Sequence, residues 1–304
     1  MIRLIHFSDI HLTVRPLGWS WRDCFNKRVF GWLNVHMLGR GRRFAQAPRI
    51  VQRLRDEILA RQPEGVIFSG DASHFGFAAE ISEAAAELGL QAGAGLPPGV
   101  AVPGNHDYYV GPAATSGAFE RFFAVWQQGV RLENRPYPFA VRLGPLWLIA
   151  VQAAHPHVAV WDASGRIGNS QLQDVQRLCR QLEGGTRVVV CHYPLLAEDR
   201  QPEPWHRRLR DWAAACQTVC HCGIALWLHG HRHRWYWLAA DQNLPCPTIG
   251  AGSATQSGRA GYLEYTFYET HLSVLRRVYD PDTDRYRDAE HFQLALPTAV
   301  TPSV

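Results

Sequence analysis

Seven side chains of types that bind transition metals occur in five short blocks between residues 9 and 233. They are two carboxylates, one amide and four imidazoles: Asp9, His11, Asp71, Asn105, His192, His231 and His233. This mixture suits first-row divalent ions such as manganese, iron or zinc, whereas calcium takes oxygen ligands alone. Seven ligands exceed what one tetrahedral ion needs, so the set predicts two ions that share a carboxylate. Two ions about 3.5–4 Å apart activate water and hold phosphoryl oxygens, which is the chemistry of phosphoester cleavage.

The stretch LHGHRHRW, residues 228–235, places three histidines at alternate positions: His229, His231 and His233. At the two-residue period of a strand, all three would share one face and bind a single ion. Alternatively, Gly230 marks the point where the strand gives way to a loop. The histidines then divide between one structural position and two different ions. The spacing alone leaves both interpretations open.

Each block lies at or just after the end of an apolar stretch that predicts a short buried strand. These stretches are residues 2–7, 65–71, 99–107, 187–192 and 223–231. Helices are expected at 48–61, 77–90, 116–127, 169–183 and 205–219, and further strands at 138–143, 146–152 and onward to about 279. This order predicts an α/β fold, a layered β-sandwich flanked by helices. Ligands gather at the carboxyl ends of strands in such sheets, so the five blocks are expected to meet at one edge.

The composition fits a folded protein with a sizeable core, since 46% of the 304 residues are hydrophobic and 19% are charged. We expect one domain over residues 1–280 and a polar tail over residues 281–304. A net charge of +4 without long runs of like charge gives no indication of nucleic-acid binding. No signal peptide or membrane-spanning stretch is recognisable, so we expect a cytoplasmic protein that can still touch a membrane surface.

The cysteines are seven in number, and an odd count argues against a disulfide framework. One group invites a zinc interpretation: Cys216, Cys220, His221 and Cys222. Its spacing lacks the paired C-x-x-C knuckles of structural zinc sites. We therefore expect core cysteines on a helix and the following strand, and we expect Cys191 to be a buried strand residue.

In chain order, the five blocks are D-x-H, G-D, G-N-H-D, H and G-H-x-H. This set resembles the calcineurin-like metallophosphoesterase superfamily, and it extends over most of the chain. The resemblance implies an α/β/β/α fold with a dinuclear metal site at the carboxyl ends of the strands. It assigns Asp9, His11 and His233 to the first ion, Asp71 to both, and Asn105, His192 and His231 to the second. Manganese is the preferred ion, with iron or zinc as alternatives.

The same resemblance implies roles for neighbours of these ligands. His106 would face the substrate and protonate the leaving oxygen, with Asp107 orienting it; alternatively, His106 is a further metal ligand or an exposed histidine. His229 falls outside the G-H-x-H block and is expected to be structural. His74, three residues after Asp71, is expected to be a loop histidine without a role, although it is close enough in sequence to reach the site.

Residues 15–44 intervene between the first ligand block and the helix expected at 48–61. Residues 15–43 carry seven basic side chains and one acidic side chain, giving a charge of +6. Helical spacing puts six apolar side chains on one broad face, with Lys27, Arg28 and Asn34 off it: Phe25, Val29, Phe30, Trp32, Leu33 and Met37. A basic helix rich in aromatic residues is typical of a membrane interface or an acyl-chain site. The alternative is a helix packed on the core with its arginines in water.

An insertion of this kind is similar to that of bacterial UDP-diacylglucosamine pyrophosphatases of lipid A synthesis. The resemblance suggests a lipid-linked nucleotide as substrate, with peripheral contact at the inner face of the membrane. Candidate substrate residues are Trp32, Arg207 and Arg208. A cyclic-nucleotide phosphodiesterase shares every metal motif and is the main alternative, and a metal-free interaction scaffold is an alternative of another class.

Overall fold

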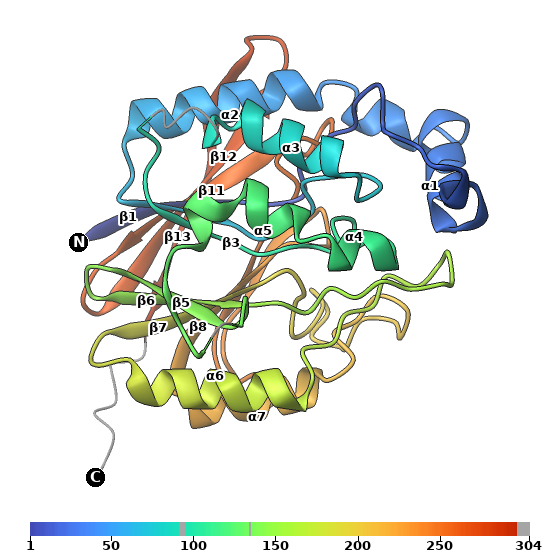
Figure 1. Ribbon diagram of the computed structural model, residues 1–304. Helices are drawn as coiled ribbons and strands as arrows, with labels where there is room; N and C mark the ends of the chain where they lie inside the picture. Colours follow the sequence, from blue (N-terminus) through green and yellow to red (C-terminus); the bar gives the residue numbers. More distant parts are fainter. Residues whose placement is uncertain (91–94, 134, 297–304) are drawn as a thin grey trace.

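The computed structural model describes residues 1–90, 95–133 and 135–296, which form four layers: helices, two facing sheets, and helices again (Figure 1). One sheet has the order β13-β12-β11-β1-β2-β3, with β1 at Ile2–Phe7, β2 at Gly65–Phe68, β3 at Gly99–Ala101, β11 at Gly261–Phe267, β12 at His271–Asp280 and β13 at Arg285–Ala295. The other sheet has the order β4-β5-β6-β7-β8-β10-β9, with β4 at Val130–Arg131, β5 at Phe139–Leu143, β6 at Leu146–Val151, β7 at Thr186–Cys191, β8 at Ile224–His229, β9 at Trp235–Leu238 and β10 at Thr248–Ala251. The expected layered α/β/β/α sandwich is confirmed.

Helices cover the outer face of each sheet. α2 (Ala47–Arg61) and α3 (Ala78–Glu87) lie on the first sheet, and α6 (Asn169–Gln181) and α7 (Trp212–His221) lie on the second (Figure 1). α2 buries Ile50, Val51, Leu54 and Ile58 at helical spacing, whereas Leu59, also expected on this face, is exposed. Shorter helices are α4 (Gly111–Thr115), α5 (Ala118–Phe122) and the 3-10 segments Trp21–Phe25, Arg40–Phe44 and Ala124–Gln127. Among the described residues, no helix has the length and apolar character needed to cross a bilayer.

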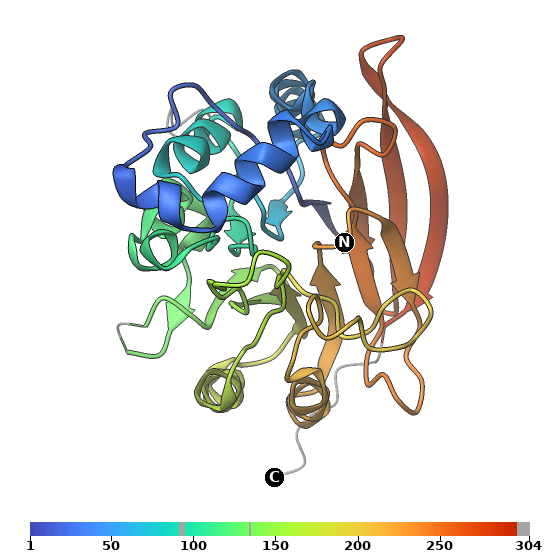
Figure 2. The same cartoon turned by 90° about the vertical axis from the view of Figure 1, so that its right-hand side faces the viewer.

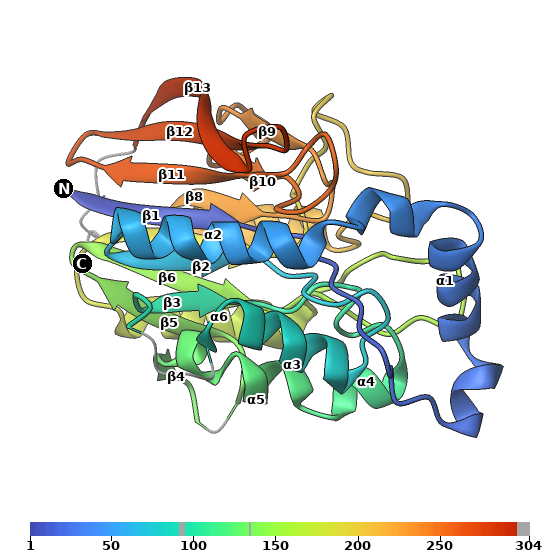
Figure 3. The ribbon, with the colours of Figure 1, turned by 90° about the horizontal axis from the view of Figure 1, so that it is seen from above.

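The carboxyl ends of the parallel strands share one edge of the sandwich. β1, β2 and β3 pair in parallel in one sheet, as do β6, β7, β8 and β10 in the other. In the view from above, their arrowheads point toward the end of the molecule where α1 (Lys27–His36) lies (Figure 3). The loops after β1, β2, β3, β7 and β8 carry the five ligand blocks, so both sheets contribute to one site.

Three elements differ from the sequence expectation. The helix expected over 116–127 is divided into α5 and the 3-10 segment Ala124–Gln127. The expected tail beyond residue 281 contains the strand β13, which pairs with β12 over ten residue pairs; residues 297–304 lie outside the described part. β13 is an edge strand with one face in water, so its side chains are mostly polar and gave no strand signal. The helix expected over 205–219 begins only at Trp212, because residues 206–210 use their backbone groups to pair with residues 163–165.

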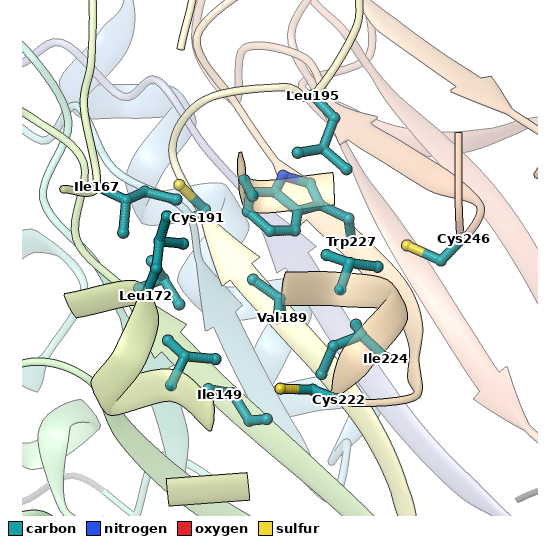
Figure 4. Close-up of a cluster of buried hydrophobic side chains, with 14 of the residues drawn as sticks. Ile149, Ile167, Leu172, Val189, Cys191, Leu195, Cys222, Ile224, Trp227 and Cys246 are labelled. Carbon is teal, nitrogen blue, oxygen red and sulfur yellow. The ribbon is translucent and has the colours of Figure 1, made fainter. Parts of the chain in front are cut away.

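The core beside α6 and α7 contains most of the cysteines (Figure 4). Cys191, Cys222 and Cys246 are buried among branched apolar side chains and Trp227, and all seven cysteines are free. Cys220 is exposed, which differs from the core position expected for it. In the described part of the chain, the cysteines join no group of metal-ligand geometry.

Candidate metal centre

Four of the candidate ligands converge on one point. Ligand atoms of Asp9, His11, Asp71 and His233 all lie within 4.8 Å of one another. Asp9 Oδ1 is 3.2 Å from His233 Nε2, and Asp71 Oδ2 is 3.6 Å from His11 Nε2. Two carboxylates and two imidazoles at these distances form a group that could hold a divalent ion.

The other three candidates adjoin this group through Asp71. His192 Nε2 lies 3.4 Å from Asp71 Oδ2 and 3.2 Å from Asn105 Oδ1. His231 Nδ1 lies 2.9 Å from the same Asn105 oxygen. Asp71 therefore stands between two sets of ligand atoms, one on each side.

Each of the four imidazoles turns one ring nitrogen outward to a carbonyl oxygen, which only accepts hydrogen bonds. The outward nitrogens donate to these acceptors: His11 Nδ1 to Ser73 O, His192 Nδ1 to Ser69 O, His231 Nε2 to Arg207 O and His233 Nδ1 to Gln256 Oε1, at 2.7–3.1 Å. An outward N–H fixes the tautomer and leaves the other nitrogen with a lone pair directed into the cluster. Outer hydrogen bonds of this kind are usual for metal-bound histidines.

The arrangement requires a positive charge at its centre. The Nε2 atoms of His11 and His233 are only 3.0 Å apart, and two lone pairs at this distance repel unless a proton or cation lies near them. Asp9 Oδ1 is fully buried and accepts no hydrogen bond in the described structure. A buried carboxylate oxygen without a donor is costly, so the donor set fits a metal ion.

Backbone conformation brings the ligands inward. Five of the seven candidates have a left-handed backbone, with φ between 50° and 71°: Asp9, His11, Asp71, His231 and His233. This region costs a non-glycine residue of order 1–3 kcal/mol, and such residues concentrate at functional sites. The strained positions coincide with the candidate ligands.

At two glycines of the ligand blocks, other atoms lie too close to the backbone to leave room for a side chain. A Cβ at Gly104 would lie 2.1 Å from Asp71 Oδ1, and a Cβ at Gly230 would lie 1.9 Å from Ser8 Oγ and 2.7 Å from Asp9 Oδ2. Any side chain there would displace a carboxylate that faces the cluster. Gly230 also allows the next residue to leave the strand, and His231 N then donates to Asp9 Oδ2 at 3.1 Å.

The electrostatics of the cluster keep its central carboxylate ionised and treat its imidazoles differently. Burial alone would raise the pKa of Asp71, but the His192 and His106 imidazoles hold it well below its ordinary value. Burial lowers the pKa of His231 well below its usual range, which keeps that ring neutral. A neutral imidazole such as His231 is the state that binds a metal. The charge of Asp71 instead raises the pKa of His192 to about 9 despite its burial, so a metal ion at this ring would take the place of a proton.

His106 lies beside the cluster, with its ring centroid 4.7 Å from that of His11, whereas the Asp107 carboxylate contacts backbone groups. The Asp107 carboxylate accepts hydrogen bonds from the backbone N–H groups of Asp71, Ser73 and Gly104 at 2.9–3.0 Å. It thereby holds the loops after β2 and β3 together, and burial together with the charge of Asp71 raises its pKa to about 6. The His106 ring instead donates from Nδ1 to the carbonyl oxygen of His74 at 2.7 Å. The orienting role expected for Asp107 stays a prediction, and the contacts described for its carboxylate are with backbone groups.

A cavity of about 510 Å³ opens above the cluster. Its wall includes expected residues (Asp71, Asn105, His106, Arg207, His231 and His233), and also His74, whose ring centroid is 5.1 Å from that of His11. Sequence reasoning missed other wall residues: Lys27, Asn34, Tyr109, Trp161 and Asp162. Lys27 could have been noticed in the sequence, because it is the only lysine of the chain. His229, buried with Nδ1 3.1 Å from Gly230 O, is not part of the wall.

The insertion lies over this cavity and is in the foreground of Figure 2. A helix of this pattern would be expected to pack its apolar face against the core, but α1 turns most of that face outward. Within α1, Lys27, Arg28 and Val35 are buried, whereas Phe30 is 59% and Trp32 is 36% exposed. Phe25 and Met37, just outside its two ends, are 82% and 72% exposed. Arg28 accounts for this orientation. Its guanidinium donates to the carbonyl oxygens of Phe75 and Gly76 at 2.9 and 2.6 Å and pairs with Asp23 at 2.6 Å.

The three candidate substrate residues are separated. Arg207 lines the cavity, but Trp32 lines a different groove with Val14, Pro16 and Trp19, on the far side of α1. Arg208 lines neither the cavity nor this groove. Of the three, Arg207 alone lines the cavity above the cluster in the described structure, and the substrate roles of Trp32 and Arg208 stay predictions.

Comparison with known proteins gives a family and a fold. The family model described as calcineurin-like phosphoesterase matches residues 2–235, while no curated protein matches the sequence. A dimetal phosphatase from Danio rerio has a similar structure with a TM-score of 0.67 at 11% identity, over 97% of this chain and 99% of that one. A purple acid phosphatase from yellow lupin (Lupinus luteus) seeds has a TM-score of 0.60 at 13% identity, over 97% of this chain and 53% of that one. PhoD has a TM-score of 0.58 at 10% identity, over 100% of this chain and 72% of that one.

The match extends over every ligand block, and it implies a site for two divalent ions, a phosphate-containing substrate and hydrolysis of phosphoester bonds. The fold, the Asp–His cluster and the family model agree, and the superfamily resemblance is confirmed. The chain belongs to the calcineurin-like phosphoesterase family.

Proposed function

We propose that this protein hydrolyses a phosphodiester or pyrophosphate bond in a substrate that also carries an apolar group, with UDP-diacylglucosamine as the best candidate. The supporting observation is the composition of the cavity above the Asp–His cluster. Its floor is polar, whereas its rim includes Phe30, Leu38, Val160 and Trp161, and Trp161 is 65% exposed. An amphipathic substrate could place its phosphate on the floor and its apolar part against the rim.

In this proposal, Asp9, His11 and His233 hold one ion, Asn105, His192 and His231 hold the other, and Asp71 contacts both. His231 and His233 then serve different ions. The metals would supply an activated water and neutralise charge on the phosphoryl oxygens. Manganese is preferred, with iron or zinc as alternatives.

His106 is the proposed general acid. Its Nδ1–H is engaged by the His74 carbonyl, so its Nε2 is the atom that would carry a proton to the leaving oxygen. The ring centroid is 4.7 Å from that of His11, which places the acid beside the proposed metals. The ring also stacks on Tyr109, with centroids 5.3 Å apart and planes at 17°.

Lys27 is the proposed phosphate-binding cation of the cavity. Its side chain lines the wall and is only 6% exposed, yet no carboxylate lies within ion-pair distance of it in the described structure. A buried ammonium without a counter-ion is unfavourable. A phosphoryl oxygen of the substrate would supply the missing charge.

We further propose that the outer face of the insertion contacts an anionic membrane surface at the cytoplasmic side. Exposed large apolar side chains gather on the insertion and on the neighbouring turns: Trp21, Phe25, Phe30, Met37, Leu38, Trp161 and Trp205. Arg15, Arg22 and Arg42 are exposed on the same segment. Exposed aromatic residues with interspersed arginines suit an interface that is apolar inside and anionic at its surface.

The proposal is tested by incubating the metal-loaded protein with UDP-diacylglucosamine in mixed micelles and measuring UMP. Release of UMP by the wild type, and its loss in Asp71→Asn, is the expected result. Hydrolysis of cyclic nucleotides without UMP release would favour a cyclic-nucleotide phosphodiesterase. If no divalent metal co-purifies and no phosphoester is cleaved, the metal-free scaffold is the remaining function.

A further inference from the structure

A second hollow, of about 530 Å³, adjoins the cavity above the Asp–His cluster. Asn34, Leu38, Arg207 and His233 line both, so the two are continuous. Five of the ten residues that line the second hollow are arginines: Arg43, Arg207, Arg232, Arg234 and Arg259. We call this the arginine hollow. Its described lining contains no aspartate or glutamate.

Only one of these arginines is neutralised. Both oxygens of the buried Glu203 carboxylate lie 2.7 Å from Arg232 nitrogens. The described ion pairs provide no acidic partner for the remaining four, which leaves about four positive charges around one concavity. Like charges facing a common space repel one another, and a bound anion relieves that repulsion.

Backbone hydrogen bonds connect two arginines of the hollow to the segment that contacts the proposed metal ligand His233. The Arg43 carbonyl accepts from Ser257 N at 2.8 Å, and Arg259 N donates to the Gln256 carbonyl at 2.9 Å. The Gln256 side-chain oxygen in turn accepts a hydrogen bond from His233 Nδ1 at 2.9 Å. An anion in the hollow would thus lie beside a candidate metal ligand, close to any phosphoryl group bound at the cluster.

We propose that the arginine hollow binds a second anionic group of the substrate, a phosphate or carboxylate beyond the phosphoryl group held at the Asp–His cluster. This inference rests on the proposed phosphoester hydrolysis. It means that the preferred substrate carries at least two anionic groups, as a pyrophosphate does and a cyclic nucleotide does not. Planar guanidinium groups contact phosphate and carboxylate oxygens in pairs, which fits a wall made of arginines and without lysine.

The test measures binding of tripolyphosphate and orthophosphate to the metal-loaded protein by calorimetry. The variant is Arg43→Met/Arg259→Met, which removes two exposed guanidinium groups from the hollow. The matched control is Arg180→Met/Arg287→Met, the same change at exposed positions on α6 and β13 that line neither hollow. We expect tripolyphosphate to bind about tenfold more weakly, or worse, to the variant, because charged hydrogen bonds are lost. Orthophosphate, which the metal centre can hold alone, should bind equally to variant and control.

Equal affinity of variant and control for tripolyphosphate would overturn the inference while leaving the hydrolase proposal standing. If the wild type cleaves no phosphoester but the variant still binds tripolyphosphate more weakly than the control, the hydrolase proposal fails and the anion site remains. A third arm uses co-sedimentation with phosphatidylglycerol vesicles. Loss of vesicle binding with unchanged tripolyphosphate affinity would make these arginines lipid contacts, and would also overturn the inference.

Discussion

The ammonium of Lys27 lies 4.2 Å from the centre of the Tyr109 ring, and that ring stacks on His106. The only lysine of the chain is thus linked through one aromatic ring to the proposed general acid. A cation over an aromatic face gains electrostatic stabilisation without a counter-ion, which lets the amine stay in the cavity. The contact also directs the amine toward the space above the Asp–His cluster rather than into solvent.

Removing this amine should weaken substrate binding more than it slows the chemical step. With bis(p-nitrophenyl) phosphate as substrate, we expect Lys27→Met to raise KM about tenfold, since a hydrogen bond to a charged group is worth roughly 1.5–3 kcal/mol. Lys27→Arg should recover most of the loss, and Arg180→Met, an exposed charge on α6, should have no effect. A fall in kcat with KM unchanged in Lys27→Met would assign the residue to the chemical step instead.

The pH dependence of KM provides a second test of Lys27. Burial lowers its pKa to about 8, although the charges of Asp162 and Asp71 oppose the shift, and Asp162 is itself paired with Arg210 at 2.6 Å. The Lys27 side chain is protonated and charged below this pH, and it loses its charge as the pH rises through this value. The KM of the wild type for the diester should therefore rise between about pH 7 and pH 9, while Lys27→Arg should stay level because arginine does not lose its proton there. Parallel profiles for the two proteins would exclude Lys27 as the titrating group.

The division of ligands between two ions can be tested by metal counting. We expect His231→Ala and His233→Ala each to lose one of two bound ions, and Asp71→Asn to lose both. Chelation should lower the unfolding temperature of the wild type, because an ion that binds only the folded state stabilises it by about 2.7 kcal/mol at one hundred times its Kd. Elemental analysis and thermal unfolding check both expectations. A wild type that binds a single ion, lost alike in His231→Ala and His233→Ala, would contradict the two-ion assignment.

Gly104 should be indispensable for metal binding although it contributes no ligand. In Gly104→Ala, the added Cβ would lie 2.1 Å from Asp71 Oδ1, so the carboxylate shared by the two ions must move. We expect loss of metal with the fold retained, as judged by circular dichroism. Gly111→Ala is the control, because a Cβ there meets no atom within 4 Å. A metal content equal to that of the control would show that the carboxylate tolerates the displacement.

The gathering of the ligand blocks could be predicted from the sequence because each block follows an apolar strand. Apolar runs are a strong local signal, and parallel strands bring their carboxyl ends to one edge. The orientation of α1 could not be predicted in this way. Its periodicity indicated an apolar face, but Arg28 donates to the carbonyl oxygens of Phe75 and Gly76, which are distant in the sequence. These contacts, together with the local ion pair to Asp23, leave most of the apolar face outside. Lys27 was missed for the same reason, since it lies on the face that the pattern assigned to solvent.

The outward apolar face of the insertion should be needed for binding to membranes. We expect Phe25→Ser/Met37→Ser to bind anionic vesicles about tenfold more weakly or worse, since full burial of each such side chain contributes roughly 1.5–3 kcal/mol. Both side chains are largely exposed, so the unfolding temperature should not change. Val125→Ser/Val130→Ser is the control, because these exposed apolar residues lie outside the insertion. Co-sedimentation with phosphatidylglycerol vesicles measures the difference; equal binding of variant and control would remove the membrane contact from the proposed function and leave the apolar rim of the cavity as its remaining support.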